Sequence, residues 1–293
     1  MTILRDTFNS LSFLTLIISF PANVFITAVN ILDFFKNRRL LLSDLLISGI
    51  TIANLLYGFL KAVLWYYSQW ISVEHFKICV HVGLYLTTIT LLFSALLSIH
   101  FCLKIVNINH RFYICLQRRF PKLFPWIIIT FLLGCFFLNL HSSLETNQDC
   151  LSNTTTNVIP VTNPKCSWST LIILAIYILG IFLCFVSALT VLISLLKHMR
   201  RIQENTEGSG SPNMEAHIRA IKTITSLLAA NILIFTFTFL KVFAENILIF
   251  ISNFLISVSH LFSSYFFIKG TKKLEKRLEE LLNRCSCFKG QNQ

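Results

Sequence analysis

The sequence predicts an all-α membrane protein: a bundle of seven transmembrane helices with the N-terminus outside and the C-terminus in the cytosol. Three observations predict this fold class: an unusually apolar composition, seven long apolar segments, and basic residues gathered on one side. Of the 293 residues, 55% are hydrophobic and 13% are charged, and the mean hydropathy is +0.69. Soluble domains carry about 25% charged residues, so this chain lacks the polar surface that a soluble fold needs.

Seven apolar segments are long enough to cross a bilayer, which takes about 20 residues. A backbone in lipid has to satisfy its own hydrogen bonds, so runs of this length are expected to be helices. The seven spans are 11–34, 40–60, 78–106, 123–140, 168–196, 218–244 and 247–268. The chain then divides into a seven-helix domain over 1–268 and a cytosolic amphipathic tail over 269–293, which is expected to lie on the lipid of the inner leaflet.

The basic residues determine the predicted orientation. Twenty of the 25 Lys and Arg residues fall in the tail and in the connections on one side of the predicted spans. Loops rich in Lys and Arg stay in the cytosol, so the N-terminus is predicted to be outside. The net charge of +12 is thereby explained by membrane topology, and no nucleic-acid partner is expected.

The longest external connection, 140–167, contains one glycosylation sequon, so Asn153 is a predicted acceptor. Its two cysteines, Cys150 and Cys166, share the oxidising side with Cys79 at the outer end of the third span. Three thiols allow three pairings, and the sequence leaves open a bridge to Cys79, a bridge within the loop, or free thiols.

The sequence contains no soluble enzyme motif: no P-loop, GxGxxG, HExxH or GxSxG. The nine cysteines have no metal-ligand spacing. We therefore predict no enzyme, no catalytic residue, no metal site and no cofactor.

Polar residues inside the predicted spans are the first candidates for function. Asn23 and Asn30 are seven residues apart, hence on one helix face, and Asp44 in the second span is their expected partner. Such a network either holds the helices together by fixed hydrogen bonds or takes part in a conformational switch. Near the outer end of the sixth span, Lys241 and Glu245 are four residues apart and can pair, either as a surface pair or at the rim of a pocket.

The third cytosolic connection is basic at both ends and contains a Gly-Ser-Pro turn. Basic helix ends around a cytosolic cleft suit a partner with an acidic surface, and they also suit anionic lipid.

Several segments carry a resemblance to a known family. The common rhodopsin-like signatures are absent, since the third span ends in CLKIV and the seventh has no Asn-Pro-x-x-Tyr. The chain instead resembles the type 2 (bitter) taste receptors, a family of G-protein-coupled receptors, over nearly its whole length. The resembling segments are Asn23–Gly49, the His100–Phe120 segment with its Leu-Lys-Ile, ISLLKHMRRIQ, AHIRAIKTITSLL and GTKKLEKRL.

The resemblance implies a plasma-membrane receptor that binds small, mostly apolar agonists in the outer half of the bundle. It also implies coupling to a heterotrimeric G protein of the gustducin or inhibitory type. Candidate ligand residues are Tyr85, Thr87, Thr88, Asn231, Phe235, Phe239 and Glu245. Candidate coupling residues are Lys104, His110, Arg111, Lys197, His198, Arg200, Arg201 and Lys222.

The chain departs from the family pattern on the pocket and switch side. Asn54 stands where the family commonly has Arg, and we place it in the polar network; Leu92 replaces a typical Trp. Type 1 vomeronasal receptors remain an alternative. A transporter or channel is more distant, because it would need repeats, broken spans and charges at the midplane. The sequence leaves homo- or hetero-oligomers open.

Overall fold

The computed structural model describes residues 2–38, 41–67, 72–106, 111–153, 168–205 and 247–290, together with positions 225–226, 229–230, 232–233 and 236. Every regular element among them is an α-helix. The elements are α1 Thr2–Asn37, α2 Leu42–Tyr66, α3 Val73–Ile105, α4 Arg111–Asn153, α5 Trp168–Asn205, α7 Ile247–Gly270 and α8 Lys272–Gly290. The predicted span 218–244 lies outside the described residues except at the positions just given, which are helical.

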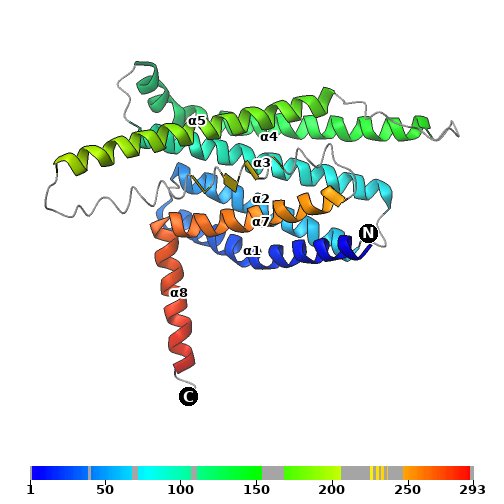
Figure 1. Cartoon of the computed structure of the whole chain (residues 1–293), viewed down its shortest axis with the longest axis horizontal. Coiled ribbons are helices and arrows are strands. Elements are labelled where there is room, and N and C mark those ends of the chain that lie inside the picture. Colours follow the sequence, from blue (N-terminus) through cyan, green and yellow to red (C-terminus); the bar gives the residue numbers. More distant parts are fainter. Residues whose placement is uncertain are drawn as a thin grey trace.

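Six of the described helices, α1 to α5 and α7, are long and apolar enough to cross a membrane. They run side by side, and α8 leaves the bundle at a steep angle to α7 (Figure 1). Helix α1 packs against α2 and α7, α2 against α3, and α3 against both α4 and α5. This arrangement agrees with the predicted bundle, six of whose seven spans fall on described helices.

The helices extend beyond the predicted spans at several ends. Helix α1 begins at Thr2 and α4 continues to Asn153, so the first half of the predicted external connection is helical. Helix α4 also passes through Pro121 and Pro125. The length of an apolar segment reflects the thickness of the lipid and not the length of the helix, because the backbone hydrogen bonds of a helix can continue into water. A proline inside a membrane helix removes one such hydrogen bond and is tolerated there.

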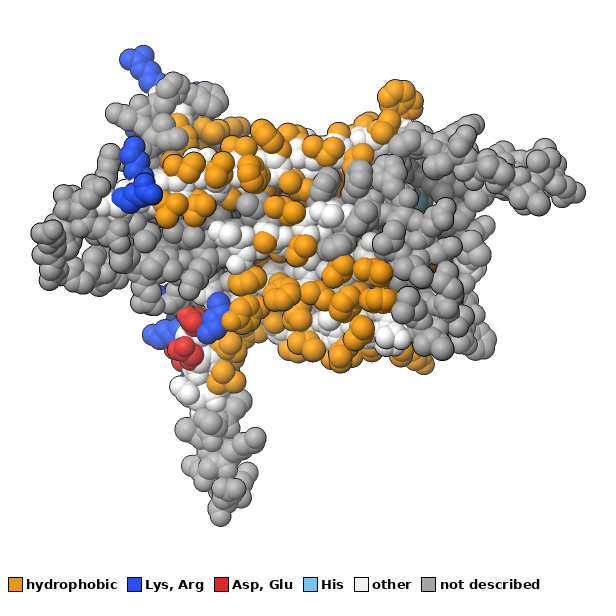
Figure 2. Space-filling view, in the orientation of Figure 1, with side chains coloured by type: hydrophobic (Ala, Val, Ile, Leu, Met, Phe, Trp, Pro, Cys, Tyr) orange, Lys and Arg blue, Asp and Glu red, His pale blue; other side chains and the backbone are white. Residues whose placement is uncertain are grey.

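Basic residues gather at one end of the bundle, which we call the basic end. Lys36 closes α1, Lys104 closes α3 and Lys269 closes α7, while Arg118 and Arg119 lie in the first turns of α4. Figure 2 shows Lys and Arg side chains clustered at this end, beside a broad apolar band over the helices. Exposed Leu, Ile and Phe side chains on the outside of the helices form a surface that suits lipid.

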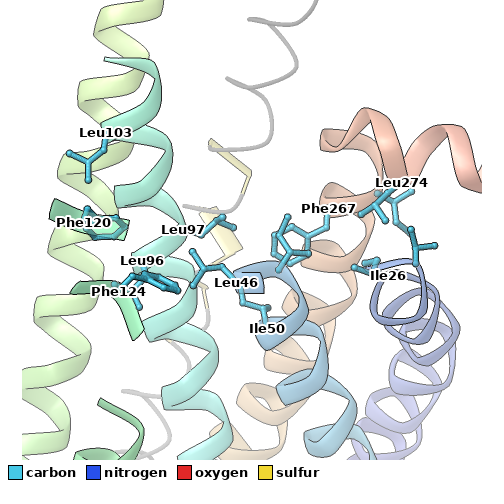
Figure 3. Close-up of a cluster of buried hydrophobic side chains, with 13 residues drawn as sticks. Ile26, Leu46, Ile50, Leu96, Leu97, Leu103, Phe120, Phe124, Phe267 and Leu274 are labelled. Atoms are coloured by element: carbon cyan, nitrogen blue, oxygen red, sulfur yellow. The ribbon is translucent and has the colours of Figure 1, made fainter. Parts of the chain in front are cut away.

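The main apolar core also lies toward the basic end (Figure 3). Side chains from five spans and α8 meet there, and Leu97, Phe124 and Phe267 are almost fully buried. Lipid tails are as apolar as leucine, so this cluster stabilises the bundle by close van der Waals packing rather than by exclusion of water. The labelled members are Ile26, Leu46, Ile50, Leu96, Leu97, Leu103, Phe120, Phe124, Phe267 and Leu274.

Gly49 sets the approach of α2 to α3 beside this core. A Cβ atom at Gly49 would lie 2.8 Å from the Phe93 ring, and Phe93 packs against the core cluster. The Gly58 site on the same helix is more open, with Leu16 Cδ2 as the nearest atom at 3.7 Å. A small residue at Gly49 is thus required by packing.

We expect Gly49→Ala to lower the free energy of unfolding by about 1–2 kcal/mol, because the Phe93 ring has to shift against a packed core. The matched substitution Gly58→Ala should be neutral or stabilising, since it gains helix propensity without a clash. Thermal unfolding of the purified chain in detergent measures both. Equal stability of the two variants would contradict this account of the α2–α3 contact.

Candidate functional site

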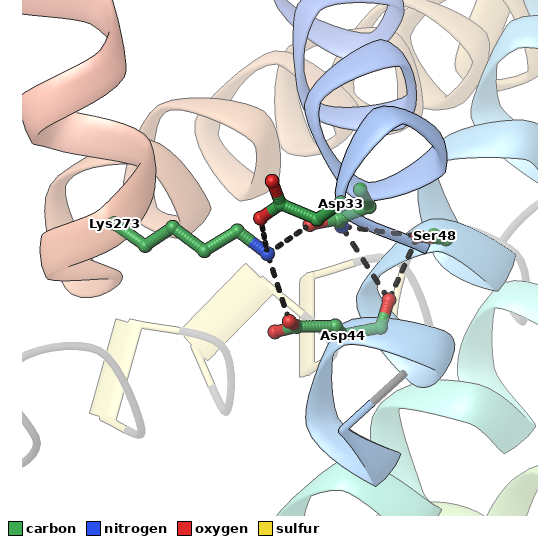
Figure 4. Close-up of polar contacts among 5 residues, drawn as sticks. Asp33, Asp44, Ser48 and Lys273 are labelled. Carbon is green, nitrogen blue, oxygen red and sulfur yellow. Dashed lines mark hydrogen bonds and ion pairs between the residues drawn. The ribbon is translucent and has the colours of Figure 1, made fainter. Parts of the chain in front are cut away.

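A three-helix clamp closes the basic end of the bundle (Figure 4). Lys273, in the first turn of α8, lies 2.8 Å from Asp33 Oδ2 of α1 and 2.9 Å from Asp44 Oδ2 of α2. Its Nζ also donates to Asn30 Oδ1 at 3.1 Å. One ammonium with three donors thus satisfies acceptors on two spans and fixes where α8 begins.

The clamp changes the protonation of Lys273. Partial burial by itself disfavours the charged ammonium, but the hydrogen bonds and negative charges of Asp33 and Asp44 outweigh it and raise the pKa of Lys273 above its ordinary value. The ammonium is therefore firmly charged at physiological pH, and the two carboxylates share this one cation from another helix.

The clamp continues into the membrane as a row of hydrogen bonds between α1 and α2. Asn30 Nδ2 donates to Ser48 Oγ at 3.0 Å and lies 3.4 Å from the Asp44 carbonyl oxygen. One turn further, the hydroxyls of Thr27 and Thr51 are 2.9 Å apart. The polar residues follow the spacing i, i+4, i+7 on both helices, which places them on facing stripes.

Helix α7 joins the same row through Asn23. Ser264 Oγ donates to Asn23 Oδ1 at 2.8 Å, and Asn23 Nδ2 donates to the Ser19 carbonyl at 2.9 Å. Asn23 thus bonds to α7, while Asn30 faces α2. We call the whole set the polar seam: Asn23, Thr27, Asn30, Asp33, Asp44, Ser48, Thr51, Ser264 and Lys273.

Asn54 continues the α2 stripe beyond Thr51 and faces α3. Its Oδ1 accepts from Thr90 Oγ1 at 3.4 Å, and its buried Nδ2 has no hydrogen-bond partner in the part of the chain that the structure describes. Of the four residues expected in the polar network, Asn30 and Asp44 therefore meet directly, Asn23 bonds elsewhere in the seam, and Asn54 bonds across to α3.

The seam contains residues that sequence reasoning missed. Asp33 was not singled out, and Lys273 was counted only among the basic residues of the tail. The available signal was Asp33 lying three residues after Asn30, on the same helix face. The pairing with Lys273 has no local signal, because the partner lies 240 residues further along the chain.

The predicted ligand residues of α3 lie in the half of the bundle away from the basic end. Tyr85 OH is 3.4 Å from the Leu132 carbonyl oxygen of α4, and its ring lies 6.1 Å from Phe136. Thr88 Oγ1 lies 3.2 Å from Tyr177 OH on α5, and both residues are buried. These contacts bring α3, α4 and α5 together around a few polar groups.

The remaining ligand candidates make no described hydrogen bond to a neighbouring helix. Thr87 is buried and its hydroxyl donates to the Gly83 carbonyl at 2.8 Å, within its own helix. The candidates of the sixth span and its outer end fall outside the described residues: Asn231, Phe235, Phe239 and Glu245.

A second polar group lies between α2 and α7 in the same half of the bundle. Lys61 Nζ donates to Asn253 Oδ1 at 3.2 Å and lies 5.6 Å from the centroid of the Tyr57 ring. The Tyr57 ring in turn lies 5.1 Å from the ring of His260. Sequence reasoning had noted Lys61 only as one of the few basic residues outside the cytosolic segments.

The coupling candidates that the structure describes gather at the basic end. Lys104 at the end of α3, Arg111 at the start of α4, and Lys197 and Arg200 on α5 are exposed. Tyr113 OH donates to the Cys102 carbonyl at 2.8 Å and fixes the start of α4 against α3. His198 and Arg201 lie in α5, with side chains outside the described set; His110 and Lys222 are not among the described residues.

The extracellular modifications stay predictions. Cys79 is a half-buried free thiol in α3, whereas the Cys150 side chain and Cys166 are not described. Asn153 is the last residue of α4, and the rest of its sequon lies outside the described residues.

A bundle whose described elements are all helical, with lipid-facing sides, a basic end and an internal polar seam, defines a multi-pass membrane protein. The sequence matches the family described as Taste receptor protein (TAS2R) over residues 1–286, and the chain belongs to this family of bitter taste G-protein-coupled receptors. It is not an enzyme. The family match favours the taste receptors over the vomeronasal receptor and transporter alternatives.

Individual relatives are similar over most of the chain. Human taste receptor type 2 member 2 is 30% identical, over 69% of this chain and 70% of the relative. Human taste receptor type 2 member 20 is 26% identical, over 100% of this chain and 99% of the relative. Mouse taste receptor type 2 member 105 is 29% identical, over 78% of this chain and 77% of the relative.

We expect Lys273→Met to lower the free energy of unfolding by about 1–3 kcal/mol, because it leaves the Asp33 and Asp44 carboxylates partly buried without their cation. Lys269→Met is the matched control: its ion pair with Glu275 is more exposed, with 55% of the lysine side chain open to solvent, and its loss should cost less than about 0.5 kcal/mol. Denaturant unfolding in detergent compares them, and equal losses would contradict the clamp.

The contribution of Lys273 should disappear in alkali. Its folded-state pKa is raised, so the stabilisation is complete below the unfolded lysine pKa of about 10.4 and is lost as the pH rises through the higher folded value. We expect the difference in unfolding temperature between wild type and Lys273→Met to be constant at neutral to mildly alkaline pH and to shrink above it. A difference that grows in alkali would have the wrong sign.

Proposed function

We propose that this receptor lies in the plasma membrane with its basic end in the cytosol, detects small and mostly apolar agonists, and activates a heterotrimeric G protein of the gustducin or inhibitory type. The single observation that carries the proposal is the division of the bundle into two ends. Basic side chains cluster at one end, whereas the buried Thr88–Tyr177 contact between α3 and α5 and the Lys61–Asn253 contact between α2 and α7 lie in the other half. A receptor needs this separation of input from output.

The orientation rests on the charges at the helix ends. The basic ends of α1, α3, α5 and α7 lie on one side of the membrane, and α8 begins there. Membrane proteins retain Lys-rich and Arg-rich connections in the cytosol. The N-terminus is then outside, together with Asn153 and the three cysteines Cys79, Cys150 and Cys166.

The agonist region is the outer half of the bundle around Thr88 and Tyr85. Thr88 and Tyr177 form a buried pair of hydroxyls between α3 and α5, which favours a mostly apolar molecule that is oriented by one or two polar contacts. Such an agonist shifts the receptor toward its active arrangement only if it binds that arrangement more tightly.

The output surface is formed by the basic ends of α3, α4 and α5. Lys104 of α3, Arg111 of α4, and Lys197 and Arg200 of α5 are all exposed. A basic surface of this kind attracts an acidic partner and steers its encounter with the receptor. Helix α8, with leucines on one side and Lys and Arg on the other, would lie along the inner leaflet.

The proposal predicts a calcium or cAMP response to a panel of bitter compounds in cells that carry a gustducin-type G protein. An epitope tag verifies surface expression. Silence across the panel despite surface expression would contradict the agonist assignment.

The coupling surface is tested by charge reversal. Lys197→Glu combined with Arg200→Glu should reduce agonist potency about tenfold or more, because it repels an acidic partner. Arg118→Glu combined with Lys122→Glu, the same double charge reversal at exposed α4 positions outside the coupling candidates, is the control and should change potency little. Equal effects in both variants would argue against a specific docking face on α5.

A further inference from the structure

His260 lies near the middle of the apolar span Ile251–Gly270 of α7 and is 2% exposed. Both ring nitrogens are shielded from solvent, and neither has a hydrogen-bond partner in the structure as described. A neutral imidazole has one N–H donor and one acceptor nitrogen, so two polar atoms are left unsatisfied. Burial without partners is costly, and ionisable residues within membrane spans commonly serve function.

The neighbouring hydroxyls on α7 are already used. Ser264 Oγ contacts the His260 carbonyl and donates to Asn23, and Ser257 Oγ donates to the Asn253 carbonyl at 2.9 Å. The side chain facing His260 from α2 is Tyr57, whose tilted ring lies 5.1 Å away and offers a contact surface. The imidazole therefore lies beside an aromatic ring, with its nitrogens unsatisfied.

A second unsatisfied group lies one turn along α2. Asn54 precedes Tyr57 by three residues on the same helix face, and its buried Nδ2 also lacks a partner among the described residues. The Asn54 amide nitrogen on α2 and the His260 imidazole on α7 thus both lack hydrogen-bond partners among the described residues. The contact between these helices is thin, since α7 packs mainly against α1. Parting α2 from α7 would disturb few other contacts.

We propose that the contact between Tyr57 and His260 is a latent binding site for a hydroxyl oxygen, which enters when α2 and α7 part. A hydroxyl both donates and accepts, so it can serve either imidazole nitrogen, while the Tyr57 ring covers the apolar part of the guest. The oxygen comes either from water or from an alcohol or phenol agonist. A hydroxyl oxygen bound at this site would lower the free energy of the arrangement in which α2 and α7 have parted, and would thereby favour that arrangement.

The agonist source rests on the proposed receptor function, whereas the water source does not. The probes are phenol and toluene, which have the same shape and differ in the hydroxyl. Wild-type protein and His260→Phe in lipid nanodiscs are titrated with each probe. If the phenol hydroxyl bonds to His260, the substitution weakens phenol binding about three- to tenfold, the value of one hydrogen bond, and leaves toluene binding unchanged.

Nitrogen-15 NMR of the histidine-labelled full chain separates the two sources. The signal of His260 is identified as the one that disappears in the His260→Phe variant. If His260→Phe fails to fold, the His260→Gln variant is used for this assignment instead. A hydrogen-bonded acceptor nitrogen without probe, with an isotope effect in D₂O, assigns the site to water. A hydrogen-bonded signal that appears with phenol and not with toluene assigns it to a ligand hydroxyl. A signal without a hydrogen bond under all of these conditions overturns the site.

Discussion

In a bilayer, every polar group inside the bundle has to find its partner within the protein, and the seam that ends at Lys273 is how this chain meets that constraint. The lysine joins Asp33 and Asp44, and the bonds of Asn30, Thr27 and Asn23 extend the row into the membrane. Helices α1, α2 and α7 are thereby held in register, and α8 is fixed where it leaves the bundle. The apolar core packs beside this row at the basic end.

The other side of the bundle depends on different contacts. Helix α3 approaches α2 at Gly49 and meets α5 through Thr88 and Tyr177. The candidate agonist residues that the structure describes, Tyr85, Thr87 and Thr88, lie in the half of α3 away from the clamp. Asn54 links the two sides by its bond to Thr90, and Tyr57 lies beside both Lys61 and His260.

Much of the fold could be predicted from the sequence because lipid imposes simple rules. Apolar segments in the sequence correctly predicted the six spans that the structure describes. The resemblance to the family was confirmed by the family match over residues 1–286. Helix ends were harder, as the continuation of α4 to Asn153 shows, because polar residues extend a helix outside lipid. Asn30 and Asp44 were expected to meet, since heptad spacing reveals a shared face. Lys273 was missed, since a partner 240 residues away leaves no local pattern.

A double-mutant cycle on Lys273 and Asp44 tests the seam most directly. The free energies of unfolding of Lys273→Met, Asp44→Asn, the double variant and wild type are measured in the same detergent. If the two side chains interact as their 2.9 Å separation indicates, the double variant is more stable than the sum of the single losses by about 0.5–3 kcal/mol. Losses that add to within about 0.3 kcal/mol would show two independent residues, and the clamp would not hold the helices together.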